Sequence, residues 1–126
     1  MDNSAVRFGG ALFVRDGGSS LTVRNSMFGR NGAINGGVVV PHLYGTGAIV
    51  FSNCSFVRNS ATNGGVYWGV HGFAMLDCLF LGNEAVVNGG VIFSTFQGNA
   101  INVIISGSSF DSNSAYEGGV FDFTGL

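Results

Sequence analysis

Large apolar residues alternate with small or polar residues in short stretches, and this alternation recurs along the whole chain. The stretches "LTVRNSMF" (21–28), "IVFSNCSF" (49–56) and "FAMLDCLF" (73–80) each place apolar side chains two residues apart. Side chains at this spacing point to the same side of a β-strand, and Val, Ile and Phe favour strands. No copy has the i, i+3, i+4 spacing that a helix requires. The pattern therefore predicts an all-β chain.

A longer repeat of the type "FVRNSATNGGV" contains these strands. It occurs in four copies after a degenerate first copy, at residues 3–11, 28–38, 56–66, 80–91 and 110–120. The Gly-Gly pairs begin at positions 9, 36, 64, 89 and 118, which gives intervals of 27, 28, 25 and 29 residues. A period in the twenties indicates a solenoid, in which each repeat buries its apolar face against its neighbours. We therefore expect a parallel β-helix of about four to five coils.

Each coil is predicted to hold two clear strands and a short third strand. One strand leads to the phenylalanine of each repeat and bends before a small Ser or Cys residue, at Asn25, Asn53, Asp77 and Gly107. Another strand begins after each Gly-Gly pair, and the short strand surrounds the N-x-A segment. The Gly-Gly pair supplies the positive φ values that a sharp corner needs.

Coils that stack in register place like residues on like residues, one rung apart. The phenylalanine of each repeat is then expected to fill the core, as Phe28, Phe56, Phe80 and Phe110. The asparagine three residues later is expected to form a hydrogen-bonded ladder along the axis, as Asn31, Asn59, Asn83 and Asn113. The conserved spacing within the repeat is thus structural in the first place.

Composition and charge narrow the class of protein. Apolar residues make up 46% of the chain and charged residues only 10%, which excludes a disordered chain. The first ten residues lack the basic and apolar regions of a signal peptide, and no apolar run is long enough for a transmembrane helix. The net charge of −2 does not favour nucleic acid or anionic membranes. All five basic residues are Arg and lie at or before Arg58, whereas five of the seven acidic residues follow it.

The motifs of the repeat are similar to those of a known family. The chain contains one "GGAL" (9–12) and four FxxN matches, "FGRN" (28–31), "FVRN" (56–59), "FLGN" (80–83) and "FDSN" (110–113). In this it resembles the polymorphic outer membrane proteins of chlamydiae, although its later copies read GGV in place of GGA. The resemblance implies a right-handed parallel β-helix in the passenger of an autotransporter, displayed at the cell surface or secreted, and used in adhesion.

The same resemblance implies that residues 1–126 form one β-helix repeat domain. It also implies that this domain is a fragment of a longer passenger, with a signal peptide and a membrane barrel outside this sequence. The chain is then held at the outer membrane by a barrel that the sequence itself does not contain.

Two cysteines, Cys54 and Cys78, occupy the same column on adjacent coils. Their spacing is within the range of a disulfide, but the parallel Cβ directions of stacked residues would strain the bond. The other interpretation is a pair of buried, reduced thiols that behave as small apolar residues. Two cysteines without nearby histidines fall short of a zinc site, so we expect no metal and no cofactor.

Arg30 and Arg58 both lie two residues after the column phenylalanine and should be neighbours. They either splay into water or share an anion, such as an acidic glycan or a sulfate group. His42 and His71 follow the Gly-Gly strands and could meet, but no carboxylate is clearly placed to orient a metal or catalytic pair. The connections in this region vary in length, and Tyr44 and Phe96 are their candidate binding aromatics.

The strand after the Gly-Gly pair has apolar residues in both parities. Its second residues are Leu12, Val39, Tyr67, Ile92 and Phe121, and the residues on either side of them are mostly apolar too. Since one strand cannot point both sets inward, one set should form an apolar stripe outside. We take Leu12, Tyr67 and Ile92 as this contact surface. Replacing Tyr67 and Ile92 by Ser is then expected to preserve the fold and to reduce self-association or ligand binding. The inward parity itself is not fixed by the sequence.

Three classes of function remain. A surface adhesin would bind a host protein or a glycan, and a structural spacer would need only stiffness. A polysaccharide-active enzyme is disfavoured, because the acidic residues fall in different columns and no paired carboxylates or catalytic motif occur. Unpaired strand edges at the two ends of a short solenoid also predict end-to-end self-association.

Overall fold

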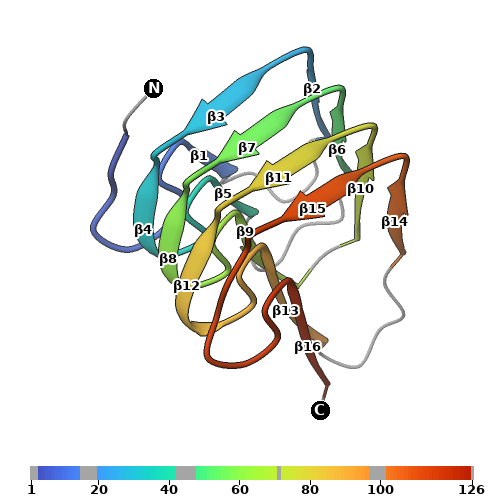
Figure 1. Ribbon diagram of the computed structural model, residues 1–126. Helices are drawn as coiled ribbons and strands as arrows, with labels where there is room; N and C mark the ends of the chain where they lie inside the picture. The colour runs from blue at the N-terminus through green and yellow to red at the C-terminus, as the bar shows by residue number, and fades with distance from the viewer. Residues whose placement is uncertain (1–2, 15–19, 42–47, 71, 97–101, 126) are drawn as a thin grey trace.

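The computed structural model shows an all-β parallel solenoid of about three turns, seen in Figure 1. It describes residues 3–14, 20–41, 48–70, 72–96 and 102–125. Within these ranges every regular element is a strand, and every strand pair is parallel. The described residues contain no helix that is long and apolar enough to cross a membrane. The predicted all-β parallel solenoid is confirmed.

Four sheets run along the solenoid axis. The β1/β16 sheet holds β1 (Leu12–Val14), β5 (Val39–Pro41), β9 (Tyr67–Gly69), β13 (Ile92–Phe96) and β16 (Phe121–Gly125). The β2/β14 sheet holds β2 (Leu21–Arg24), β6 (Ile49–Ser52), β10 (Phe73–Leu76) and β14 (Val103–Ser106). The β3/β15 sheet holds β3 (Met27–Gly29), β7 (Ser55–Val57), β11 (Leu79–Leu81) and β15 (Ser109–Asp111). The β4/β12 sheet holds β4 (Gly32–Asn35), β8 (Ser60–Asn63) and β12 (Glu84–Asn88).

A full coil therefore has four strands, where the sequence predicted three. The run leading to each phenylalanine is two strands, because the predicted bend is a complete corner. Asn25, Asn53, Asp77 and Gly107 all have positive φ, between 51° and 59°. This left-handed conformation turns the chain sharply and ends the first strand. Asn53 also donates to Asn25 Oδ1 across the coils at 2.8 Å, so the corner is tied along the axis as well.

A second left-handed corner lies between the phenylalanine and the ladder asparagine. Its residues are Arg30, Arg58, Gly82 and Ser112, with φ between 54° and 62°. This corner could not be predicted from the sequence, because only one of its four residues is glycine. It rotates the chain so that the next residue, the asparagine, points into the solenoid.

The asparagine ladder is confirmed. Asn59 donates from both its backbone nitrogen and its Nδ2 to Asn83 Oδ1, at 3.0 and 2.9 Å, and Asn31 donates to Asn59 Oδ1 in the same way. The other Nδ2 hydrogen of Asn59 reaches back to the carbonyl oxygen of Phe28 at 3.0 Å. Asn31, Asn59 and Asn83 are at most 1% exposed, so these bonds satisfy amides that water cannot reach.

The phenylalanine column is confirmed as the centre of the core. Neighbouring rings of Phe28, Phe56, Phe80 and Phe110 stack with centroids 5.2, 4.9 and 4.7 Å apart and interplanar angles of 8° or less. Phe56 and Phe80 are 0% exposed. Since such rings pack face to face only when the coils are in register, the column and the ladder support each other.

Both glycines are required in the four Gly-Gly pairs that begin at Gly9, Gly36, Gly64 and Gly89. The first has positive φ, as predicted, between 54° and 63°. At the second glycine of these four pairs the coils approach each other so closely that a Cβ would collide with the neighbouring backbone, whereas a Cβ on Gly119 would come no closer than 4.0 Å to another atom. A Cβ on Gly65, for example, would lie 2.2 Å from the carbonyl oxygen of Gly90.

Replacing this second glycine tests the close approach. Gly65→Ala should lower the free energy of unfolding by about 3 kcal/mol, because neither backbone can move without breaking the register. Gly32→Ala is the matched control, since its Cβ would come no closer than 3.4 Å to Ser60 Oγ. We expect the control to change stability by less than about 1 kcal/mol in urea unfolding. Equal losses of unfolding free energy in both variants would contradict the close approach of the coils at Gly65.

Candidate functional site

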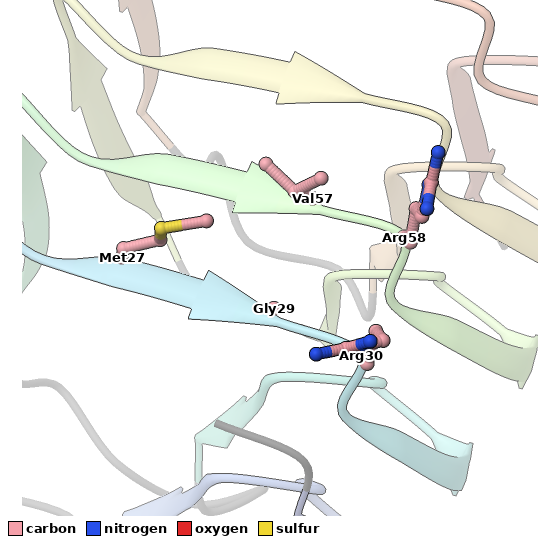
Figure 2. A pocket seen from close by; sticks show the side chains of 5 residues that line it. All are labelled: Met27, Gly29, Arg30, Val57 and Arg58. Carbon is pink, nitrogen blue, oxygen red and sulfur yellow. The ribbon is translucent and has the colours of Figure 1, made fainter.

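A hollow opens on the outer side of the β3/β15 sheet, where β3 and β7 end (Figure 2). Its volume is about 270 Å³, and it is lined by Met27, Gly29, Arg30, Val57 and Arg58. The Met27 side chain is 68% exposed and forms an apolar wall with Val57. The hollow thus combines two guanidinium groups with aliphatic surface.

The structure brings Arg30 and Arg58 to matching corners of neighbouring coils, as predicted. Both are exposed, and Figure 2 shows their side chains leaving the ends of β3 and β7 in different directions. They have φ values of 55° and 54°, in a region that costs an L-residue roughly 1–2 kcal/mol. The next coil places Gly82 at this corner, with φ of 62°. Arginine therefore occupies two positions where the backbone favours glycine.

The predicted outer stripe of Leu12, Tyr67 and Ile92 is wrong. Tyr67 and Ile92 are 0% exposed, and Leu12 packs against the same core. The residues directly after the Gly-Gly pairs, such as Val66 and Val91, are also 0% exposed and belong to the core. Both parities point inward, and the substitution of Tyr67 and Ile92 by Ser would open the core.

The reason is a local irregularity at the start of these strands. The carbonyl oxygen of Val91 accepts from two successive nitrogens, those of Val66 and Tyr67, both at 2.9 Å. The two coils nevertheless stay in one-to-one register, with Tyr67 opposite Ile92, so one carbonyl oxygen serves two nitrogens without an inserted residue. Regular alternation begins only with the strand itself, so Val66 and Tyr67 can both turn toward the core.

The outward column of the β1/β16 sheet follows one residue later. Phe13, Trp68 and Phe93 lie on it, and Trp68 pairs with Phe93 in the register of β9 and β13. The ring of Phe8 lies 5.8 Å from Phe13 and 5.9 Å from Trp68. We call Phe8, Phe13, Trp68 and Phe93 the aromatic patch. Sequence reasoning missed Phe8. The signal that could have revealed it is a phenylalanine at a position of the repeat where the later coils have polar residues, namely Asn35, Asn63, Asn88 and Glu117.

Several predicted site residues cannot be placed. Tyr44, His42 and His71 lie outside the described residues. Phe96 is the last residue of β13, and its side chain is also outside the described part of the chain. Among the residues that the structure does describe, no three His, Cys, Asp or Glu side chains gather as a metal site would require.

The two cysteines are free thiols, and both are buried. This confirms the interpretation as reduced, apolar-like residues. Cys78 Sγ donates to the carbonyl oxygens of Leu76 and Phe51, at 3.3 and 3.6 Å. Removal from water raises the pKa of the Cys78 thiol above its ordinary value, and this effect outweighs the backbone hydrogen bond at Cys54, which lowers the pKa.

Comparison with known proteins supports the resemblance seen in the motifs. Residues 77–95 match the Chlamydia polymorphic membrane protein (Chlamydia_PMP) repeat. The match spans β11, β12 and most of β13, with one FxxN motif and one Gly-Gly pair. No curated protein and no solved structure matched the chain. The repeat at residues 77–95 is therefore similar to the Chlamydia polymorphic membrane protein repeat.

The raised pKa of Cys78 predicts a pH dependence of stability. Because the folded state favours the protonated thiol, the contribution of Cys78 to stability should be fully present below the ordinary pKa of 9.0 and be lost as the pH rises above it. Cys78→Ser is the matched variant, since Ser26 and Ser108 occupy the same column. Urea unfolding at neutral pH and well above pH 9.0 should show a smaller loss in the variant than in the native sequence. Identical losses of stability in the variant and the native protein would contradict the raised pKa of Cys78.

Proposed function

We propose that this chain is a segment of a surface-displayed passenger that binds a host or glycan partner and has no enzymatic activity. The proposal includes a right-handed β-helix of about four to five coils, formed by residues 1–126 as one domain. The match of residues 77–95 to the Chlamydia polymorphic membrane protein repeat is the observation that carries it. That repeat type suggests association with the outer membrane or the cell surface.

The hollow beside Arg30 and Arg58 is the proposed binding site. Guanidinium groups pair with carboxylate and sulfate oxygens through directed, charge-assisted hydrogen bonds. The aliphatic wall of Met27 and Val57 offers an apolar contact to the ring of a sugar. A sulfated or otherwise acidic glycan combines these two chemistries.

A structural spacer is the second candidate function. The continuous ladder and the stacked phenylalanines give a stiff rod, and a rod needs no ligand to hold other domains apart. The unpaired edges at the two ends of the stack would add end-to-end association to either function. The adhesin and the spacer differ in one respect, which is saturable binding at a defined site.

Arg58→Gly tests the site without disturbing the fold. Glycine fits the corner, as Gly82 does in the next coil, so the variant should be as stable as the native protein or more stable by about 1 kcal/mol. Titration with a heparin oligosaccharide should show saturable binding to the native protein. The dissociation constant should rise about tenfold or more in the variant, as loss of a charge-assisted bond implies.

Arg24→Gln is the matched control, since Arg24 is an exposed arginine on another sheet. Its effect on binding should be less than about threefold, the size expected of a distant surface charge. If both variants lose affinity equally, the attraction is general electrostatics and the hollow is not the site. If the native protein shows no saturable binding to this probe, the spacer function is favoured.

A further inference from the structure

The aromatic patch is a group of rings on the outside of the β1/β16 sheet. On this face Phe13 is 49% exposed, whereas Val40, its register partner on β5, is only 1% exposed. Phe8 links the rings of Phe13 and Trp68, at centroid distances of 5.8 and 5.9 Å. Phe93 lies next to Trp68 in register. Rings gathered in this way on a solvent-facing sheet mark an interaction surface.

Opposite charges lie at the two ends of this patch. At the first end, Arg7 Cζ lies 5.4 Å from the ring centre of Phe8. At the other end, Asp122 on β16 pairs in register with Phe93. Glu117 is close to Asp122, because one end of the Asn88 side-chain amide lies 3.1 Å from a carboxylate oxygen of Asp122 and 3.2 Å from a carboxylate oxygen of Glu117. The face is therefore positive at its beginning, aromatic in its middle and negative at its end.

Such a face is complementary to itself when one copy is turned around. We propose that a second copy of this chain docks on the aromatic patch in an antiparallel orientation, about a two-fold axis near Trp68. The outward column begins at Phe13 and ends at Asp122, four rungs or about 19 Å away, with Trp68 in the middle rung. A two-fold axis at Trp68 thus places each Arg7 near the partner's acidic end.

The charges also select the orientation. A parallel arrangement would set Arg7 against Arg7 and Asp122 against Asp122, and such like-charge contacts oppose association. In the antiparallel arrangement the same contact forms twice, as an isologous interface requires. The rings between the charged ends supply the apolar centre, and the charged residues form the rim. This dimer does not use the Arg30 and Arg58 hollow, which lies on the β3/β15 sheet.

Trp68 is the only tryptophan of the chain and reports directly on this face. Sedimentation velocity should show a concentration-dependent dimer of the native protein. The emission of Trp68 should shift to shorter wavelength over the same concentration range, since docking removes the ring from water. A monomer at the highest attainable concentration would overturn the proposal.

Charge exchange tests the orientation. Arg7→Asp and Asp122→Arg should each weaken dimerisation about tenfold or more, and the double variant should return to within about threefold of the native value. A double variant weaker than either single variant would overturn the antiparallel arrangement. Urea unfolding of each variant separates these effects from loss of fold, because Asp122 also accepts a hydrogen bond from Thr124.

Phe13→Ser is a second, independent variant, since this exposed ring contributes little to the core. It should keep the stability of the native protein and weaken the dimer about tenfold. Phe13→Ser and both charge variants could associate as strongly as the native protein, with no shift of Trp68 emission. This result would show that copies meet end to end, and it would overturn the proposal. A shift of Trp68 emission that does not depend on protein concentration but follows added neutral oligosaccharide would assign the face to a glycan instead.

Discussion

The hydrogen bonds between buried asparagines are the constraint on which the rest of this solenoid depends. Asn31, Asn59 and Asn83 are almost completely removed from water, so each amide must find its partners on the neighbouring coils. A slip of one coil by a single residue would leave these groups unpaired, at about 1–3 kcal/mol for each lost partner. The spacing between ladder residues nevertheless varies, at 28, 24 and 30 positions. The register is therefore held by the ladder, and the connections between coils absorb the differences in length.

The ladder also links the fold to the candidate binding site. An asparagine can point inward only because the residue before it turns the chain through a left-handed corner. At that corner a side chain must leave the solenoid, and in two coils the side chain is arginine. The same FxxN motif thus contains the core ring, the outward residue and the ladder amide. Variation at the corner changes the outer surface and leaves the core unchanged, which is how a repeat scaffold can carry a site on one of its edges.

The regular parts of the structure could be predicted from the sequence, and the irregular parts could not. Phe56 and Asn59 recur at fixed offsets, so their stacking follows from the period alone. The contact surface was misplaced because Val66 and Tyr67 both face the core where the chain leaves the Gly-Gly corner, and no residue type marks this departure from alternation. Phe8 escaped notice because it replaces a polar residue in a partial first coil. The arginine pair was identified, but its hollow depends on the exposed Met27, whose position only the structure shows.

The most direct test of this account is hydrogen exchange of asparagine amides, followed by NMR. Within the ladder, the backbone and side-chain amides of Asn59 and Asn83 should exchange only on global unfolding, since both lie in the middle of the stack. The side chain of Asn53, which is exposed and donates to Asn25 Oδ1, should exchange much faster. If the amides of Asn59 and Asn83 exchange as fast as that of Asn53, the ladder does not hold the coils in register, and the central claim is wrong.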